Sequence, residues 1–185
     1  MRLLPYLGSA MQTYGEEHIP LVRPLVLEYP GDPRAADAVD QFLCGTEILV
    51  APVLSAEGRR AVYLPAGRWV DFWTLEPHEG PRAVEVESPL DRIPAFAAEG
   101  AIVPMEGNPY FGRDLAEEPL EIHVFGRPSG RSLTLYDQGR SIGLTASWEG
   151  SRAIFQSGPV ARRRVSWVWR GCGRRTRTRS GPGRR

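Results

Sequence analysis

The stretch "DQFLCGTEILVAP", residues 40–52, marks the place where the pattern of the chain changes. Before it lie a helical pattern, a nearly continuous apolar run and a turn; after Gly45, short strand-like segments are separated by Gly and Pro. Turn signals about every 8 to 12 residues are typical of antiparallel sheets packed as sandwiches. We therefore predict that a helix ends at Gly45 and that the first strand of a β-rich region begins near Ile48.

The first 45 residues are predicted to form a helix, a strand and a second helix. Apolar residues recur at helical spacing at Leu3, Leu4, Leu7, Ala10, Met11 and Tyr14. The run "IPLVRPLVLEY", residues 19–29, predicts a strand buried on both faces, as in a parallel sheet covered by helices. "RAADAVDQFLC", residues 34–44, predicts a short helix with Asp32 as its N-cap. This order of elements is typical of an α/β unit.

The rest of the chain is predicted to be mainly β, in two β-sandwich domains. The strand-like segments include "ILVAPVL", "RRAVYLP", "GRWVDFW", "RAVEVES", "LEIHVFG", "RSLTLYD" and "LTASW". The acid-rich "GRDLAEEP", residues 112–119, is predicted to connect the two domains. We expect domains at residues 1–45, 46–116 and 117–170, the last one incomplete, and an Arg-rich disordered tail at residues 171–185.

Composition excludes several classes of protein. The 185 residues are 42% hydrophobic, which is enough for a core, and no stretch approaches the roughly 18 to 20 apolar residues of a membrane span. We expect a soluble, cytoplasmic chain that does not contact membranes. Cys44 and Cys172 are too few and too far apart for a disulfide framework or a metal cluster, so we expect two free thiols, no metal and no cofactor.

The charge is distributed unevenly. Residues 1–161 carry all 22 acidic residues against 13 arginines, whereas residues 162–185 carry 10 arginines, and the chain has no lysine. Clustered arginines can neutralise the phosphates of a nucleic acid. A disordered extension, or a stretch read out of frame in a GC-rich gene, explains the tail equally well. We do not expect nucleic-acid binding.

Two groups of acidic residues invite a catalytic or metal-binding interpretation. Glu16, Glu17 and His18 are adjacent, but neighbouring helix residues point in different directions, so we predict a solvated helix end. Asp40 and Glu47 could form the carboxylate pair of a glycosidase, which lies about 5 to 9 Å apart. Spacing alone cannot show such a pair, and we expect Asp40 to anchor a turn and Glu47 to face solvent.

The remaining candidates have both a structural and a binding interpretation. Cys44 lies on a mostly apolar segment, which favours a buried inert thiol over a nucleophile. Arg23 stands in an apolar run, so its charge must meet either a ligand or a structural acid. Four aromatic residues could stack on sugar rings, although alternating aromatics in a strand usually form core; they are Tyr63, Trp69, Phe72 and Trp73.

Taken in order, several segments resemble motifs of the C-terminal part of glycoside hydrolase family 31, the α-glucosidase and α-xylosidase family. "LLPYLGSA" is similar to "LPYLYSL", "IPLVRPLVLEYPGD" to "GxPxxRPLxxxFPxD", and "DQFLCGTEILVAPVL" to "DQFMxGxxLLVAPV". Further on, "VYLPAGRWVDFWT" resembles "VYLPxGxWxDFWT", "LDRIPAFAAEGAIVPM" resembles "xxxIPxFVRxGxIIPx", and "LTLYDQGRSIG" resembles "xxLYEDDGxSxxY". The resemblance covers residues 2 to about 150, and "YDQG" departs from the usual acidic turn.

The resemblance implies a (β/α)8 barrel followed by two β-sandwich domains, and a retaining mechanism with two catalytic aspartates on earlier barrel strands. It implies that this chain corresponds to the last barrel unit and the sandwiches. No acid of this chain then inherits a catalytic role, its substrate-binding residues are unknown, and α-glucosides or α-xylosides bind through the barrel. The alternative is a non-catalytic β-sandwich module that binds carbohydrate or supports a partner enzyme.

Overall fold

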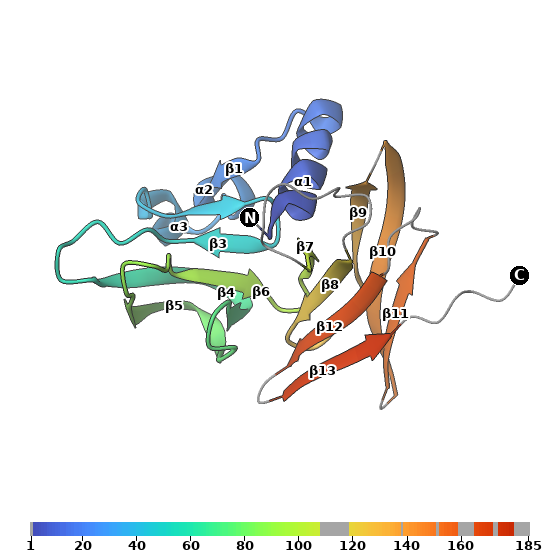
Figure 1. Cartoon of the computed structure of the whole chain (residues 1–185). Helices are drawn as coiled ribbons and strands as arrows, with labels where there is room; N and C mark the ends of the chain where they lie inside the picture. The colour runs from blue at the N-terminus through green and yellow to red at the C-terminus, as the bar shows by residue number, and fades with distance from the viewer. Residues whose placement is uncertain are drawn as a thin grey trace, which may run out of the picture. The chain divides into compact units, whose positions relative to one another are not determined.

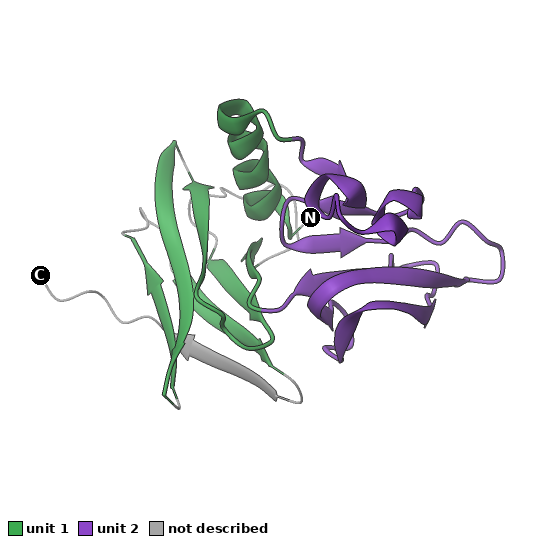
Figure 2. Ribbon diagram, turned by 180° about the vertical axis from the view of Figure 1, so that it is seen from behind, with its two compact units in different colours: residues 1–19, 100–185 green, residues 20–99 purple. Residues whose placement is uncertain are grey.

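The computed structural model describes residues 2–107, 119–137, 139–150, 152–158 and 165–171, together with the backbone of residues 174–179. The chain divides into two compact units (Figure 2): unit 1 comprises residues 1–19 and 100–185, and unit 2 comprises residues 20–99. Strands dominate both units, which confirms the predicted mainly β class. Within the described residues, no helix is both long and apolar enough to cross a membrane.

Unit 2 is built on one six-stranded antiparallel sheet (Figure 1), whereas a sandwich of two packed sheets was expected. Its strand order is β1-β2-β3-β6-β4-β5. The strands are β1 (Val22–Pro24), β2 (Phe42–Cys44), β3 (Ile48–Val50), β4 (Arg59–Asp71), β5 (Pro77–Glu87) and β6 (Ala95–Ala98). Two short helices accompany them, α2 (Leu25–Glu28) and α3 (Pro33–Asp37).

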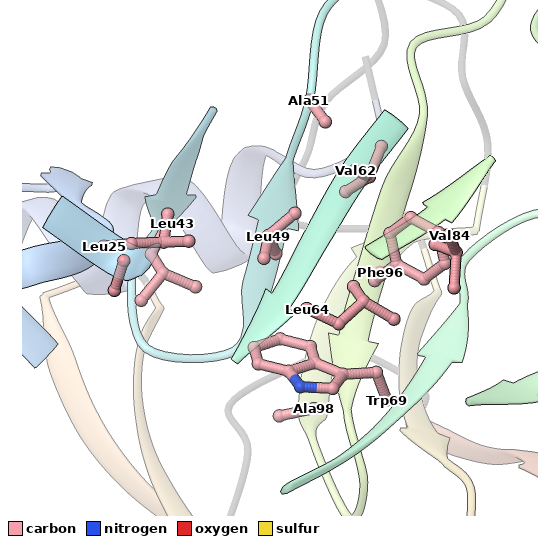
Figure 3. Close-up of a cluster of buried hydrophobic side chains, with 11 residues drawn as sticks. Leu25, Leu43, Leu49, Ala51, Val62, Leu64, Trp69, Val84, Phe96 and Ala98 are labelled. Atoms are coloured by element: carbon pink, nitrogen blue, oxygen red, sulfur yellow. The ribbon is translucent and has the colours of Figure 1, made fainter. Parts of the chain in front are cut away.

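The core of unit 2 joins both helices to the sheet. Figure 3 shows the Trp69 side chain among its aliphatic neighbours. The buried members are Leu25, Ala35, Leu43, Leu49, Ala51, Val62, Leu64, Trp69, Val84, Phe96 and Ala98. The indole N–H of Trp69 donates to the Pro65 carbonyl at 2.9 Å, so this buried polar atom is satisfied.

The segment before Gly45 differs from the prediction. The helix predicted over residues 34–44 ends at Asp37, and Phe42–Cys44 form a strand that pairs antiparallel with β3. Gly45 therefore serves as a turn residue between two strands, with a φ of 63° that favours glycine, instead of ending a helix. The short apolar runs on either side of it are compatible with a strand as well as a helix, which explains the error.

The predicted long strand over residues 19–29 is also wrong. Only Val22–Pro24 are extended, and they pair antiparallel with β2 at the edge of the sheet, with a single buried residue, Arg23. Pro24 lacks a backbone N–H and suits an edge position, and Leu25 directly after it starts helix α2. The apolar residues of this segment thus lie partly on an exposed surface and partly in the core.

Strand β4 unites two segments that were predicted as separate strands. The register between β4 and β5 shifts between Leu64 and Gly67, and the hairpin turns after Asp71. Gly67 (φ 124°) pairs with Gly80. A Cβ added at position 80 would lie 2.0 Å from the Pro65 carbonyl oxygen. The close approach of the two backbones at this irregularity requires glycine at position 80.

Unit 1 is a two-layer β-sandwich with one helix. One sheet has the order β11-β10-β9 and the other β13-β12-β8-β7, and β12 runs parallel to β8. The strands are β7 (Ile102–Glu106), β8 (Leu120–Phe125), β9 (Arg131–Asp137), β10 (Arg140–Glu149), β11 (Arg152–Ser157), β12 (Val165–Gly171) and β13 (Arg174–Arg179). The core lies between the sheets and contains Ile102, Leu120, Ile122, Val124, Leu135, Ile142, Leu144, Ala146 and Trp167.

Helix α1 (Leu4–Glu17) belongs to unit 1, whereas the prediction grouped it with residues 20–45. It lies beside strand β9 (Figure 1), and the Tyr136 N–H of that strand donates to Ser9 Oγ at 3.0 Å. The stretch before the helix pairs with β7, because the Glu106 N–H donates to the Arg2 carbonyl at 2.8 Å. Both β7 and β9 are edge strands, so α1 and its leading residue occupy one side of the sandwich.

The C-terminal segment is more regular than expected. Residues 165–171 form β12, and Trp167 packs in the core against Phe155 with a ring-centroid distance of 5.1 Å. Residues 174–179 form β13, paired antiparallel with β12, where a disordered tail was predicted. Cys172, residues 180–185 and most of the predicted connection at residues 112–118 lie outside the described residues.

Candidate functional site

The polar residues of "DQF" tie the start of β2 to β4, which lies about twenty residues further along the chain. Gln41 is 3% exposed, and its side-chain amide acts as a clamp on the backbone of Tyr63. Gln41 Nε2 donates to the Tyr63 carbonyl at 2.6 Å, and the Tyr63 N–H donates to Gln41 Oε1 at 2.9 Å. The amide thus replaces the backbone partner that a neighbouring strand would supply.

Asp40 and Tyr63 complete this polar cluster at the strand ends. The Arg60 guanidinium donates to Asp40 Oδ1 at 2.8 Å, and also to the carbonyls of Asp40 and Pro52. The Tyr63 hydroxyl donates to Asp32 Oδ2 at 2.5 Å. Partial burial, together with this hydrogen bond to a carboxylate, raises the pKa of Tyr63 to about 12. The prediction that Asp40 has a structural role is therefore consistent with its contacts, although they reach β4 and not only the local turn.

Glu47 and Cys44 do not form a reactive site with Asp40. Glu47 was expected to face solvent, but it is 5% exposed, and Thr46 Oγ1 donates to its Oε1 at 3.1 Å. A sugar cannot reach a carboxylate at this depth, whereas Asp40 is held at the surface by Arg60. Burial raises the pKa of the Cys44 thiol, which makes the thiol less nucleophilic.

Arg23 and the aromatic residues each had a structural and a binding interpretation. The structure supports the structural one for Arg23, whereas the aromatic residues divide between core and surface. Arg23 is buried and pairs with Glu28, and its Nε donates to the Pro20 carbonyl at 2.7 Å, so it has the structural partner. Of the aromatic residues, Trp69 belongs to the core, while Trp73 is 45% exposed in the same strand–turn segment. Phe72 contacts Trp73 edge-on, with ring centroids 5.4 Å apart.

The cluster at the end of α1 is a capping and contact region. His18 adopts a left-handed conformation (φ 59°), and its N–H donates to the Tyr14 carbonyl at 2.9 Å. Glu16 accepts a hydrogen bond at 2.8 Å from the Tyr136 hydroxyl of β9, and Glu17 is exposed. In the part of the chain that the structure describes, no three His, Cys, Asp or Glu side chains gather where they could hold a metal ion.

Unit 1 contains a polar cluster that the sequence did not indicate. Arg2, Glu121, His123 and Arg170 come from the N-terminal stretch, β8 and β12. Arg2 Nη2 lies 2.5 Å from Glu121 Oε2, and His123 Nε2 lies 3.0 Å from the same oxygen. Arg170 Nε donates to His123 Nδ1 at 2.8 Å. His123 is 1% exposed, so the middle of this chain of contacts is buried, whereas the Arg2 side chain at one end is 36% exposed.

The contacts define the protonation state of His123. The Arg170 Nε always carries a proton, so His123 Nδ1 must accept, and Nε2 then carries the ring proton and donates to Glu121. Burial, followed by the Arg170 charge, lowers the pKa of His123 to about 4. Both ring nitrogens are engaged with protein groups, and the ring is buried, so the cluster is suited to holding strands together and not to proton transfer with a substrate.

The sequence pattern indicated only two of the four residues of this cluster. Glu121 and His123 alternate with the apolar residues of "LEIHVFG", so they share one face of a predicted strand. A strand with two polar residues on one face normally exposes that face to solvent. Only the fold brings Arg2 and Arg170 to this face, from 119 and 47 residues away.

Comparison with known proteins assigns this architecture to a family. Residues 18–103 match the model described as the glycosyl hydrolase family 31 C-terminal domain. The chain is 32% identical over 148 residues to alpha-glucosidase 2 of Bacillus thermoamyloliquefaciens, a match covering 79% of this chain and 18% of that enzyme. It is 34% identical over 151 residues to an alpha-xylosidase of Saccharolobus solfataricus, covering 80% of this chain and 20% of the relative.

A solved structure shows the same arrangement of elements. The cycloalternan-forming enzyme from Listeria monocytogenes, in complex with a pentasaccharide substrate, superposes with a TM-score of 0.84 at 26% identity, covering 91% of this chain and 17% of that one. The chain thus spans about a fifth of the length of the relatives it matches. From the family match, these relatives and the shared fold, residues 18–103 form a C-terminal domain of glycosyl hydrolase family 31.

Proposed function

We propose that this chain is the C-terminal, non-catalytic part of a retaining α-glycosidase that hydrolyses the O-glycosyl bonds of α-glucosides or α-xylosides. The observation that carries the proposal is the match of residues 18–103 to the C-terminal domain of the family. The relatives named alpha-glucosidase 2 and alpha-xylosidase support the two substrate classes. Its role in such an enzyme is to complete and stabilise the barrel that holds the catalytic groups.

The polar residues of this chain support a structural role. Asp40 is bound by Arg60, Glu47 is buried, and His123 is held between Arg170 and Glu121. A glycosidase needs two carboxyl groups that face the same sugar from opposite sides. The barrel of this family takes roughly 250 residues, and its active site is assembled from loops after all eight strands. We therefore expect the 185-residue chain alone to be inactive.

An exposed apolar surface on unit 2 also supports docking onto another domain. Val22, Val26 and Leu27 lie close together in sequence on β1 and α2, and they are 55%, 39% and 50% exposed. Neighbouring apolar side chains that remain exposed on a folded unit commonly mark an interaction surface. The rest of a family 31 enzyme would cover them.

The first experiment is an activity assay of the purified chain with p-nitrophenyl α-glucoside and α-xyloside. We expect no release of p-nitrophenol above the blank, while alpha-glucosidase 2 assayed in parallel as a positive control hydrolyses the glucoside. In a second arm, the chain is mixed with the part of alpha-glucosidase 2 that precedes the shared region, and a gain of activity over either part alone is expected. Turnover that follows the purified chain through successive columns would contradict the proposal.

One observation favours the alternative, a module that binds carbohydrate. The exposed Trp73 is held in a fixed orientation: its indole N–H donates to the Ile93 carbonyl at 2.8 Å, and the Arg92 guanidinium carbon lies 5.8 Å from its ring centroid. An exposed aromatic ring beside hydrogen-bond donors can stack on a sugar. Calorimetric titration with malto-oligosaccharides tests this. Binding that Trp73→Ala abolishes and Leu90→Ala preserves would favour the module.

A further inference from the structure

The buried ring of His123 connects strand β8 with segments from both ends of the chain. On one side, its Nε2 donates to the Glu121 carboxylate at 3.0 Å, and the same carboxylate pairs with Arg2 of the N-terminal stretch. On the other side, its Nδ1 accepts from Arg170 Nε of β12 at 2.8 Å. One ring therefore has a separate contact toward the N-terminal stretch and toward a strand near the C-terminus.

The two contacts respond in opposite ways when the ring gains a second proton. Nδ1 then carries a hydrogen and can no longer accept, so two donors and two positive charges face each other at Arg170. Nε2 remains a donor, and its hydrogen bond to the Glu121 carboxylate gains the attraction between opposite charges. Acid therefore breaks the contact toward β12 and strengthens the contact toward Arg2.

The charges around the ring favour the same direction of opening. The charged side chains that act on the ring are Arg170 of β12, Glu121 of β8 and Arg2 of the N-terminal stretch. On β7, the register places Val103 beside His123 and Met105 beside Glu121, and neither of these β7 side chains titrates. On β13, Arg175 stands opposite Arg170 in the register. The strands on the β12 side of the ring thus carry arginines, whereas the acid belongs to β8.

Strand β12 is also less deeply buried than its neighbour. It pairs with β8 in parallel from Val165 to Arg170. All six residues of β8 are buried, whereas the buried residues of β12 are Trp167 and Gly171. Segments with few buried apolar contacts open locally at a smaller cost in free energy than the core of a fold. Separation of β12 from β8 therefore requires less energy than unfolding of the whole sandwich.

We propose that the contact between His123 and Arg170 is an acid-sensitive latch, which holds β12 on β8 at neutral pH and lets β12 separate in acid while Arg2, β7 and β8 stay together. The latch is independent of the proposed function, because every group in it belongs to unit 1. It makes the chain respond to acid at one defined place, the boundary between β8 and β12.

Hydrogen exchange followed by mass spectrometry, corrected for the intrinsic effect of pH on exchange, tests the latch between pH 7 and pH 5. The pKa of the ring rises from about 4 to its ordinary value of about 6.5 when β12 separates, so the separation should become about twentyfold more frequent at pH 5. Peptides of β12 should exchange about twentyfold faster, and those of β7 and β10 should change less than about twofold. Equal acceleration in all three strands would show that unit 1 opens as a whole and would overturn the latch.

Two variants and a matched control assign the response to the latch. His123→Gln keeps an acceptor for Arg170 and a donor for Glu121 but does not titrate, so β12 should change less than about twofold. Arg170→Gln can turn its carbonyl oxygen toward a protonated ring, so the difference between β12 and β7 should disappear. His78→Gln removes a titratable ring from β5 of unit 2 and should leave the response of β12 unchanged.

Circular dichroism at pH 7 identifies which variants are folded, and either latch variant is sufficient for the test. A response of β12 that persists in folded His123→Gln or Arg170→Gln would overturn the latch. Loss of the response in His78→Gln would also overturn it, because the titrating group would then lie in unit 2.

Discussion

Unit 2 and unit 1 are stabilised by different kinds of contact. Unit 2 is a continuous segment, residues 20–99, whose core joins two helices to one sheet, and its buried polar side chains Gln41 and Arg23 meet partners only 22 and 5 residues away in the sequence. Unit 1 combines residues from both ends of the chain, and charged groups tie them together through the Arg2, Glu121 and Arg170 contacts around His123.

The difference shows how segments distant in sequence are brought into register. Apolar burial stabilises a fold without strong preference for direction, whereas a buried ion pair that loses one partner leaves an uncompensated charge. Unit 1 must position the N-terminal stretch against β7 and β8, more than a hundred residues away, and the Arg2–Glu121 pair accepts only one arrangement. In unit 2, the hairpins β2–β3 and β4–β5 pair strands that are close in sequence, and the ion pairs Arg23–Glu28 and Arg60–Asp40 also join residues that are close in sequence.

The largest expected effect is removal of the central side chain of unit 2. Trp69→Ala leaves a cavity in the core and should lower the free energy of unfolding by about 3 to 5 kcal/mol, enough to unfold unit 2 at equilibrium or nearly so. Hydrogen exchange followed by mass spectrometry measures each unit separately. Peptides from residues 59–98 should lose protection, while those from β8 and β10 keep theirs.

Trp73→Ala is the matched control for this substitution. It removes the same side chain four residues later, at a position that is 45% exposed, and should cost about 1 kcal/mol or less. Equal destabilisation by the two substitutions would show that Trp69 does not dominate the core. Loss of protection in β8 and β10 on Trp69→Ala would show that the two units unfold together and are not stabilised independently.

The next largest effect concerns the charged cluster of unit 1. Glu121→Gln removes the carboxylate that Arg2 and His123 share, and leaves the partly buried Arg2 guanidinium without its counter-charge. We expect a loss of about 2 to 4 kcal/mol, confined to unit 1. Glu87→Gln breaks an ion pair with Arg59 in which both side chains are largely exposed, and it should cost less than about 1 kcal/mol. Denaturant unfolding monitored by circular dichroism compares the two, and a smaller effect at Glu121 than at Glu87 would contradict a stabilising role for the cluster.

A third substitution tests the neutral clamp of unit 2. Gln41→Ala leaves the N–H and the carbonyl of Tyr63 without their partner, at a site where Gln41 is almost fully buried. An unsatisfied buried backbone group costs about 1 to 3 kcal/mol, although water entering the new space offsets part of it, so we expect about 2 kcal/mol. Gln41→Glu keeps the acceptor but loses the amide donor. It should also destabilise unit 2, and unchanged stability in both variants would reject the clamp.

The sequence predicted the parts of this protein that depend on local pattern. Short strands separated by glycine and proline indicated the mainly β class, and several motifs in a consistent order indicated the family. The sequence could not distinguish a helix from a strand in "DQFLC", because a run of five residues is too short to show a period of 3.6 or of 2. Helix α1 was predicted, but the apolar periodicity did not indicate that its buried residues are Pro5, Tyr6 and Ser9.

The polar clusters depend on long-range pairing, which no local pattern contains. Gln41 meets Tyr63 because β4 passes the start of β2, and His123 meets Arg170 because β12 lies parallel to β8. The sequence after Trp148 departs from the family motifs, which led to the prediction of an incomplete domain. The structure instead shows Trp167 in the core of unit 1, because alternation of apolar residues in "VSWVW" suffices to form a strand.

The smallest effect, and the one most specific to unit 1, is a dependence of stability on pH. The pKa of His123 is about 4 in the folded state, below the value of about 6.5 that is ordinary for an unfolded chain. Between these values the unfolded state binds more protons, so the stabilisation is complete above pH 6.5 and declines as the pH falls toward 4. From about pH 7 to about pH 5, unit 1 should lose on the order of 1 to 2 kcal/mol through this residue.

The control is His123→Gln, whose side chain does not titrate. In this variant, the stability reported by peptides of β8 and β12 should change less between pH 7 and pH 5 than in the unaltered chain. Peptides of unit 2, which contains the neutral clamp, should show no such difference between the two proteins. Identical pH profiles for the variant and the unaltered chain would show that burial and the Arg170 charge do not hold His123 neutral.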